Sequence, residues 1–187
     1  IKKLSKLQVD VVFVPQADEI YSKNFSTSIV EKTLSQKIEG EARPNFFGGV
    51  LTVVLLLFNV VKPRRAYFGE KDLQQLMVIK KMVSDLKYPI QIVSVKTVRE
   101  KSGLAFSSRN QYLNKQEQNE AKIIYECLVK AKEQIQNQTQ IKTVKHEMVK
   151  KLKSKNMQVD YVSFVKLSSF QELNKSTEFP LAICVAV

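Results

Sequence analysis

AYFGEKDLQQL, from Ala66 to Leu76, is the stretch around which the predicted fold is built. The apolar residues Ala66–Phe68 end at Gly69, and the charged residues Glu70–Asp72 follow. From Leu73 onward, apolar and polar residues recur with a helical period. This order predicts a strand, a glycine turn and the start of a helix.

A junction of this kind suits an anion. The first turn of a helix has free backbone N–H groups and the positive end of the helix dipole. Lys71 would add a full positive charge there. The alternative is an ordinary surface turn with solvated charges, because α/β folds contain many such turns. The residue pattern alone leaves both interpretations open.

The stretches around this junction predict an α/β domain. Val9–Val14 is apolar and stops at Pro15, which predicts a buried parallel strand. Val50–Val61 is apolar all round, so it is a buried helix or strand: its valines favour a strand and its length favours a helix. Pro89–Val95 is the next predicted strand. Strands alternating with helical segments indicate a doubly wound sheet.

The rest of the chain predicts a small α+β unit. Two helices are expected between residues 115 and 155, with a break near 137–140. One carries Cys127 and Ala131 on its apolar face, and the other carries Val144, Met148 and Leu152. His146 falls on the polar side and is expected to be a solvated surface residue. Two strands follow, at Val159–Val165 and Leu181–Val187.

Composition limits the class of protein. The net charge is +12, and Lys and Arg outnumber Asp and Glu by 8 in residues 1–110 and by 4 in residues 111–187. Phosphate-bearing ligands, nucleic acid or an acidic partner are compatible with this excess, and so is a Lys-rich surface. Two cysteines and one histidine make a disulfide framework or a zinc site improbable and favour a reducing compartment. The apolar run Val50–Val61 is too short to cross a bilayer.

A second motif, TVREKSGLAFSSRNQYL, covers residues 97–113. Ser102-Gly103 predicts a turn. Ser107, Ser108 and Arg109 then place two hydroxyls beside a guanidinium, a combination that fits phosphate oxygens. The alternative is a surface loop that leads to a helix capped by Asn114.

Three segments follow one another along the chain: EGEARPNFFGGVLTVVLLLFNVVKP, RAYFGEKDLQQL and TVREKSGLAFSSRNQYL. Taken together, they resemble the pantoate–β-alanine ligase (pantothenate synthetase) family, and the resemblance covers essentially all 187 residues. It implies a Rossmann-like, doubly wound parallel-sheet nucleotidyl-transferase domain followed by a small α+β domain. Residues 1–97 would be the C-terminal part of the first domain, and residues 98–187 would be the second.

The same resemblance implies a function. The family condenses pantoate with β-alanine at the expense of ATP, through a pantoyl-adenylate intermediate, with Mg²⁺ bridging phosphate oxygens. A cytoplasmic homodimer without nucleic-acid or membrane partners is expected, with the dimer formed through the nucleotide-binding domain. Such chemistry requires orientation and cations around a charged transition state more than acid–base catalysis in its first step.

Site residues follow from the resemblance, position by position. Lys71 would lie near the phosphates, Asp72 would accept from ribose hydroxyls, and Gln75 would bind pantoate from the same helix face as Lys71. Ser107, Ser108 and Arg109 resemble the family's mobile phosphate-gripping segment, and with Lys71 they are the expected catalytic set. The remaining expected contacts are Gly69 and Glu70 with ATP, Val98 and Phe106 with adenine, and Val53 and Val54 with the dimethyl group of pantoate.

The chain departs from the family pattern at several positions. His146 is the one histidine of the chain, so the family's HxGH motif is absent. The sequence therefore resembles a fragment of a family member that lacks both the N-terminal and the C-terminal segments. Phe46 stands where the family has histidine, and Leu56 where it has lysine. We therefore expect this chain alone to have little or no ligase activity. The alternatives are a catalytically dead relative that serves as a binding or scaffold protein, and a basic nucleic-acid-binding module, for which no motif is present.

Overall fold

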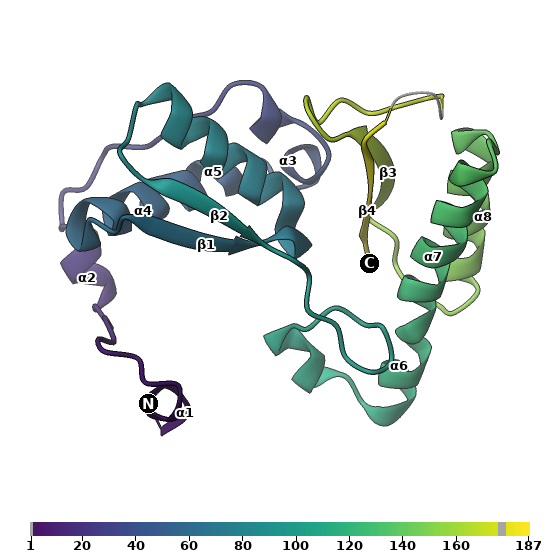
Figure 1. Ribbon diagram of the computed structural model, residues 1–187, viewed down its shortest axis with the longest axis horizontal. Coiled ribbons are helices and arrows are strands. Elements are labelled where there is room, and N and C mark those ends of the chain that lie inside the picture. Colours follow the sequence, from purple (N-terminus) through teal and green to yellow (C-terminus); the bar gives the residue numbers. More distant parts are fainter. Residues whose placement is uncertain (1, 176–178) are drawn as a thin grey trace.

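The computed structural model describes residues 2–175 and 179–187 as two halves lying side by side (Figure 1). The N-terminal half contains the helices α4 and α5 and the strands β1 and β2, and the C-terminal half contains α7, α8, β3 and β4. In chain order the helices and strands are α1 (Lys2–Lys6), α2 (Ala17–Ile20), the 3₁₀ turn η1 (Leu34–Gln36), α3 (Glu39–Ala42), α4 (Phe46–Val61), β1 (Arg65–Gly69), η2 (Glu70–Asp72), α5 (Leu73–Asp85), β2 (Gln91–Val95), η3 (Ser108–Tyr112), α6 (Lys115–Glu120), α7 (Lys122–Gln136), α8 (Ile141–Lys153), β3 (Tyr161–Lys166) and β4 (Leu181–Ala186).

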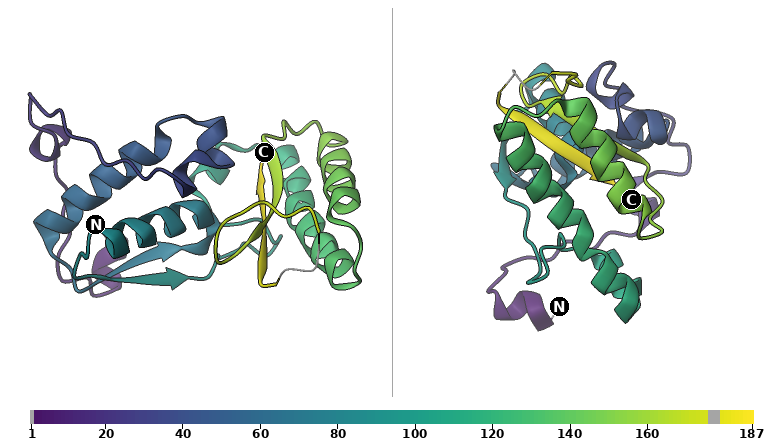
Figure 2. Two further views of the ribbon diagram at one scale, coloured as in Figure 1. Left: turned by 90° about the horizontal axis from the view of Figure 1, so that it is seen from above. Right: turned by 90° about the vertical axis from the view of Figure 1, so that its right-hand side faces the viewer.

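The sheet of the N-terminal half is a parallel pair. Strand β1 runs beside β2 with Arg65 opposite Gln91 and Gly69 opposite Val95. Helices α4 and α5 lie on one face of this pair, as the left view of Figure 2 shows. The other face carries Tyr67, which is 63% exposed. The predicted parallel pairing is confirmed, whereas helices on both faces, as a doubly wound sheet requires, are not seen among residues 2–175 and 179–187.

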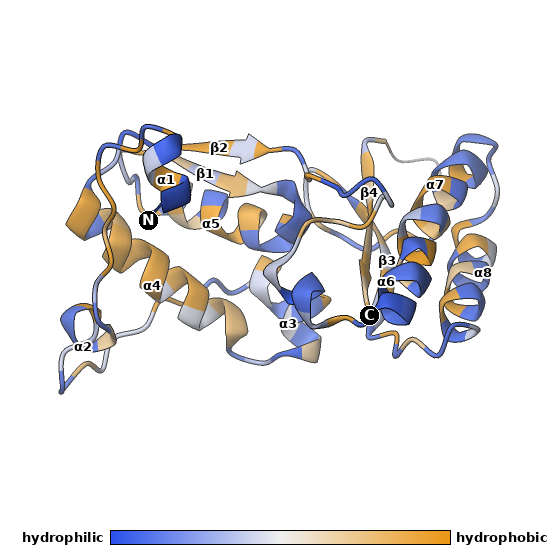
Figure 3. Cartoon of the chain, turned by 90° about the horizontal axis from the view of Figure 1, so that it is seen from below, coloured by the Kyte–Doolittle hydropathy of each residue, from blue (hydrophilic) through white to orange (hydrophobic). Residues whose placement is uncertain are grey.

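Helix α4 resolves the ambiguity of the long apolar run. It begins after Arg43-Pro44, as expected for a residue pair that cannot lie inside a helix. It ends at Val61, and the N–H of the next residue, Lys62, donates to the Phe58 carbonyl at 2.9 Å, directly before Pro63. The helix is hydrophobic along most of its length (Figure 3). None of the helices in the described part of the chain combines the length and apolarity needed to cross a membrane.

The prediction of a strand at Val9–Val14 is wrong. Residues 9–16 form neither helix nor strand, and Val11 is 79% exposed. A strand needs a partner that supplies backbone hydrogen bonds. In the described structure the strand that pairs with β1 is β2, and residues 9–14 pair with neither of them.

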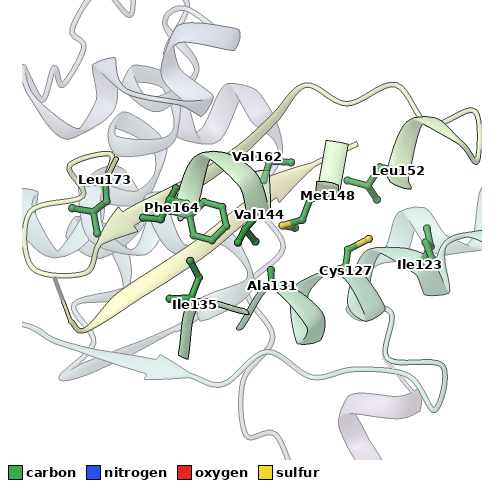
Figure 4. Packing of buried hydrophobic residues seen from close by; sticks show 11 residues of the cluster. Ile123, Cys127, Ala131, Ile135, Val144, Met148, Leu152, Val162, Phe164 and Leu173 are labelled. Atoms are coloured by element: carbon green, nitrogen blue, oxygen red, sulfur yellow. The ribbon is translucent and has the colours of Figure 1, made fainter. Parts of the chain in front are cut away.

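The C-terminal half has its own core. Helices α7 and α8 are separated by a break at residues 137–140, as predicted, and strands β3 and β4 pair antiparallel with Tyr161 opposite Ala186. The predicted apolar faces meet in one cluster that is separate from the cluster of the N-terminal half (Figure 4). Its buried members include Ile123, Cys127, Ala131, Ile135, Val144, Met148, Leu152, Val162, Phe164 and Leu173.

Candidate functional site

The candidate site begins at the turn from β1 into α5. Strand β1 ends at Gly69, and Glu70–Asp72 form the 3₁₀ turn η2 that leads into α5. Gly69 has φ −73°, so the turn does not require the left-handed region that glycine favours. The charged residues of this turn are exposed. Because Val95 at the end of β2 lies opposite Gly69, both strands deliver their carboxyl ends to the same edge, where α/β sheets bind ligands.

This turn has the features expected of an anion site. Within residues 2–175 and 179–187, the side chains of Lys71 and Asp72 form no ion pair or hydrogen bond. Asp72 precedes α5 without capping it, so its carboxylate is free to accept from a ligand. The first N–H groups of the 13-residue helix α5 have no intrahelical partners. An ammonium group, free N–H groups and the helix dipole therefore meet at one point.

Two neighbouring amides on α5 differ sharply in their contacts. Gln75 is half-buried, and no hydrogen bond of its side chain is found in the described part of the chain, so its amide can bind a ligand. Gln74 is 7% exposed, and its Nε2 donates to the carbonyls of Leu34 (2.8 Å) and Lys37 (2.6 Å). The role of Gln74 was missed from the sequence. Its place one helical turn before the buried Val78 was the available signal.

The predicted pantoate wall lies on α4. Val53 and Val54 are both half-buried. Val54 packs against the core cluster that contains Phe47 and Leu51, so part of its surface is already used in packing. Leu56 is half-buried on the same helix. Phe46 begins the helix, and the guanidinium of Arg43 lies 3.9 Å from the centre of its ring.

The second motif forms a hairpin-like loop. The N–H of Phe106 donates to the Val98 carbonyl at 2.9 Å, and Arg99 forms a β-bridge with Ala105. The predicted adenine contacts Val98 and Phe106 are thus brought together, and each is 65% exposed. Such apolar side chains have surface free for a flat ring to cover.

Ser107, Ser108 and Arg109, which carry the predicted hydroxyl and guanidinium groups, come directly after this loop in the chain. The Ser107 hydroxyl accepts from the Arg109 N–H at 3.2 Å and thereby caps η3. Ser108 and Arg109 are exposed. Asn110, which the sequence did not single out, donates through Nδ2 to Glu100 Oε1 (2.7 Å) and to the Ala105 carbonyl (3.1 Å). The loop and the Ser107–Arg109 segment are therefore fixed to each other.

The structure does not join all the predicted site residues. No hydrogen bond or ion pair among the described residues connects Gly69–Gln75 to Ser107–Arg109. His146 is exposed on α8, as predicted. Among residues 2–175 and 179–187, no group of three or more His, Cys, Asp or Glu side chains could hold a metal ion. The turn η2 itself carries two exposed carboxylates, those of Glu70 and Asp72.

Comparison with known proteins identifies the family. The model of the family described as Pantoate-beta-alanine ligase matches residues 1–187. The chain belongs to the pantoate–β-alanine ligase family. A family member, the pantothenate synthetase of Thermosipho africanus, is 44% identical over 176 residues, which are 94% of this chain and 63% of that relative. The chain therefore spans less than two thirds of that ligase's length.

Solved structures of pantoate–β-alanine ligases share the fold. The pantothenate synthetase of Thermus thermophilus superposes with a TM-score of 0.86 at 38% identity, covering 93% of this chain and 65% of that one. The ligase of Francisella tularensis, described as complexed with β-γ ATP and β-alanine, has a TM-score of 0.73 at 30% identity and covers 100% and 67%. The recognition made from the three sequence segments is thus confirmed.

Proposed function

We propose that this chain contributes to the ATP-dependent condensation of pantoate with β-alanine. The pantoate carboxylate attacks the α-phosphorus of ATP, so a pantoyl adenylate forms and pyrophosphate leaves. The β-alanine amine then attacks the activated carbonyl, an amide bond forms and AMP leaves. The observation that carries this proposal is the Lys71–Asp72 turn at the N-terminus of α5, whose side chains have no partner within residues 2–175 and 179–187 and which lies at the edge where β1 and β2 end.

In this proposal, each side chain of the site has its own role. Lys71 and the α5 N–H groups bind phosphate oxygens, and Asp72 accepts from the ribose hydroxyls. Gln75 orients pantoate, whose dimethyl group contacts Val53 and Val54. Ser108 and Arg109 approach the phosphates from the other half, with the loop carrying Val98 and Phe106 against adenine. Holding both reactants in line lowers the barrier without a general base in the first step.

Mg²⁺ would enter with ATP. The described residues offer two exposed carboxylates near the turn, and magnesium is commonly bound by one or two carboxylates together with substrate phosphates. When bound, the ion would neutralise charge that develops on the phosphate oxygens. Lys71 and Arg109 supply the fixed positive charges of the site.

The test of this function is ATP binding. Lys71→Met removes one charge-assisted contact, worth about 1.5–3 kcal/mol, so we expect the Mg-ATP affinity measured by calorimetry to fall about 10- to 150-fold. Lys81→Met is the matched control, because Lys81 is also exposed on α5 but pairs with Asp85 instead. Equal affinities of the two variants for Mg-ATP would show that Lys71 does not bind ATP.

We expect the 187-residue chain alone to release little AMP from ATP in the presence of pantoate and β-alanine. Phe46 and Leu56 replace family residues that would face pantoate or phosphate, and Arg43 is stacked on Phe46. Turnover close to that of a full-length family member would contradict this expectation. ATP binding without AMP release would favour the second candidate, a relative that binds substrates but no longer joins them.

The assembly proposed for the chain is a cytoplasmic homodimer. Val60 and Val61, at the end of α4, are 57% and 53% exposed, and this helix is apolar along most of its length. Exposed apolar surface of this kind marks interaction sites. Light scattering of the purified chain measures the assembly directly, and a monomeric mass would contradict it.

A further inference from the structure

The two parts of the candidate site lie in different halves of the molecule. The turn Gly69–Asp72 belongs to the N-terminal half. The loop that leads to Ser107–Arg109 is attached to α7: the guanidinium of Arg99 lies 4.4 Å from the ring centre of Tyr125, and Gly103 packs directly against that ring. The relation between the two parts therefore depends on how the halves are held together.

One turn lies where the halves meet. Lys37 Nζ donates to the Ser169 carbonyl in the C-terminal half at 3.3 Å. Glu39 is close to Tyr161 of β3: burial, and after it this carboxylate, raise the pKa of the Tyr161 hydroxyl. Lys37 and Ile38 line a hollow with Tyr161 between the two halves. Lys37–Glu39 is thus part of the surface through which the N-terminal half contacts the C-terminal half.

The backbone of this turn is strained. Ile38 has φ 45° and ψ −99°. A β-branched residue with positive φ is a genuine outlier that persists only where the surroundings impose it. Relaxation of Ile38 would rotate the peptide groups on both sides, which it shares with Lys37 and Glu39, and both of these residues contact the C-terminal half.

Gln74 provides the restraint. Its Nε2 donates to the Lys37 carbonyl at 2.6 Å, and its Oε1 accepts from the Glu39 N–H at 3.2 Å. One buried amide therefore holds the peptide groups on both sides of Ile38. Gln74 also lies in the first turn of α5, directly after the anion site.

We infer that Gln74 is a positioning residue: by clamping the strained turn at Ile38 it sets the orientation of the C-terminal half, and with it Ser107–Arg109, relative to Gly69–Asp72. The consequence for catalysis rests on the proposed function. The clamp itself does not, because it can be tested on the chain without any ligand.

The test is a distance measurement between the halves. Nitroxide labels are attached to Ser84→Cys on α5 and Lys132→Cys on α7, both of which replace exposed residues. The native thiols react slowly at neutral pH, because Cys127 is buried and burial raises the pKa of Cys184 to about 11. Mass spectrometry verifies that two labels are present, and pulsed electron paramagnetic resonance gives the distance distribution.

We expect Gln74→Leu to broaden this distribution at least about twofold, since it keeps the volume of the side chain but removes all three hydrogen bonds. Gln75→Leu is the matched control and leaves the distribution narrow. Circular dichroism under the conditions of the distance measurement verifies that Gln74→Leu is folded, which separates a change of positioning from simple loss of stability.

Two results would overturn the inference. One is a distribution of unchanged width in Gln74→Leu, and the other is equal broadening by Gln74→Leu and Gln75→Leu. If Gln74→Leu does not fold, Gln74→Met is measured in its place, because a flexible thioether fits the same space without the hydrogen bonds. The same two outcomes apply to it.

Discussion

Gly103 is the glycine that combines a positive φ with close side-chain packing, so its substitution is expected to be damaging. Its φ is +87°, and a Cβ built there would lie 2.1 Å from a ring carbon of Tyr125. Gly103→Ala therefore combines an unfavourable backbone conformation with a collision against a half-buried ring. We expect the free energy of unfolding to fall by about 1–3 kcal/mol, measured by urea denaturation.

Gly49→Ala is the control for this prediction. Gly49 lies in α4, and a Cβ built there meets nothing within 4 Å. Alanine in a helix is favoured over glycine by about 1 kcal/mol, so stability should stay the same or rise. If Gly103→Ala were as stable as Gly49→Ala, that result would contradict the close packing of the loop against Tyr125.

At the level of single residues, the sequence motif indicated the free side chains but not the anchoring ones. Lys71 and Gln75 are exposed or half-buried without partners in the described part of the chain, which agrees with their predicted roles without testing them. Gln74 and Asn110 were missed, because their function depends on partners. Gln74 binds residues 35 to 40 positions away, and no local pattern reports such contacts.

The thiol of Cys184 on strand β4 is expected to make the free energy of unfolding fall at alkaline pH. Burial raises the pKa of Cys184 from 9.0 to about 11, so the folded state holds this proton more tightly than the unfolded state. The resulting stabilisation is complete below pH 9 and is lost as the pH rises to 11. We expect a loss on the order of 2 kcal/mol over this interval. Tyr161 on β3 acts in the same direction, because its pKa is raised as well.

Cys184→Ser isolates the contribution of this thiol. A serine hydroxyl does not titrate in this range, so the fall in unfolding free energy between pH 9 and 11 should become shallower. The part due to Tyr161 should remain. Chemical denaturation at several pH values gives both slopes, and parallel slopes for the two proteins would exclude Cys184 as the source.

At the level of elements, periodicity predicted the helices well and the strands less well. Helices α5, α7 and α8 were expected from their apolar faces, and these faces are buried. The run Val50–Val61 has no polar face, so its helical state follows from its length and from Pro63 instead. The prediction of a strand at Val9–Val14 was wrong because apolar, β-branched residues only favour a strand. The strand itself forms only where a partner strand lies beside it.

At the scale of the whole molecule, the described residues form two hydrophobic cores. One lies among α4, α5, β1 and β2, and the other among α7, α8, β3 and β4. The domain boundary predicted near residue 97 falls in the segment between the two cores. A domain boundary separates units that fold independently, and this is a property of unfolding rather than of packing. The boundary stays a prediction. The halves also make contacts through Lys37 and Glu39, which favour joint unfolding.

A matched pair of core substitutions tests the boundary. Leu51 and Leu152 are each 0% exposed, one in each core. Replacing either by alanine costs about 2–5 kcal/mol through lost burial and the cavity that remains. If the halves unfold separately, Leu51→Ala should lower amide-exchange protection in α4 and α5 and leave α7 and α8 unchanged, and Leu152→Ala should do the reverse. Loss of protection in both halves with either variant would instead mean one cooperative unit. In that case residues 98–187 would not form a separate domain.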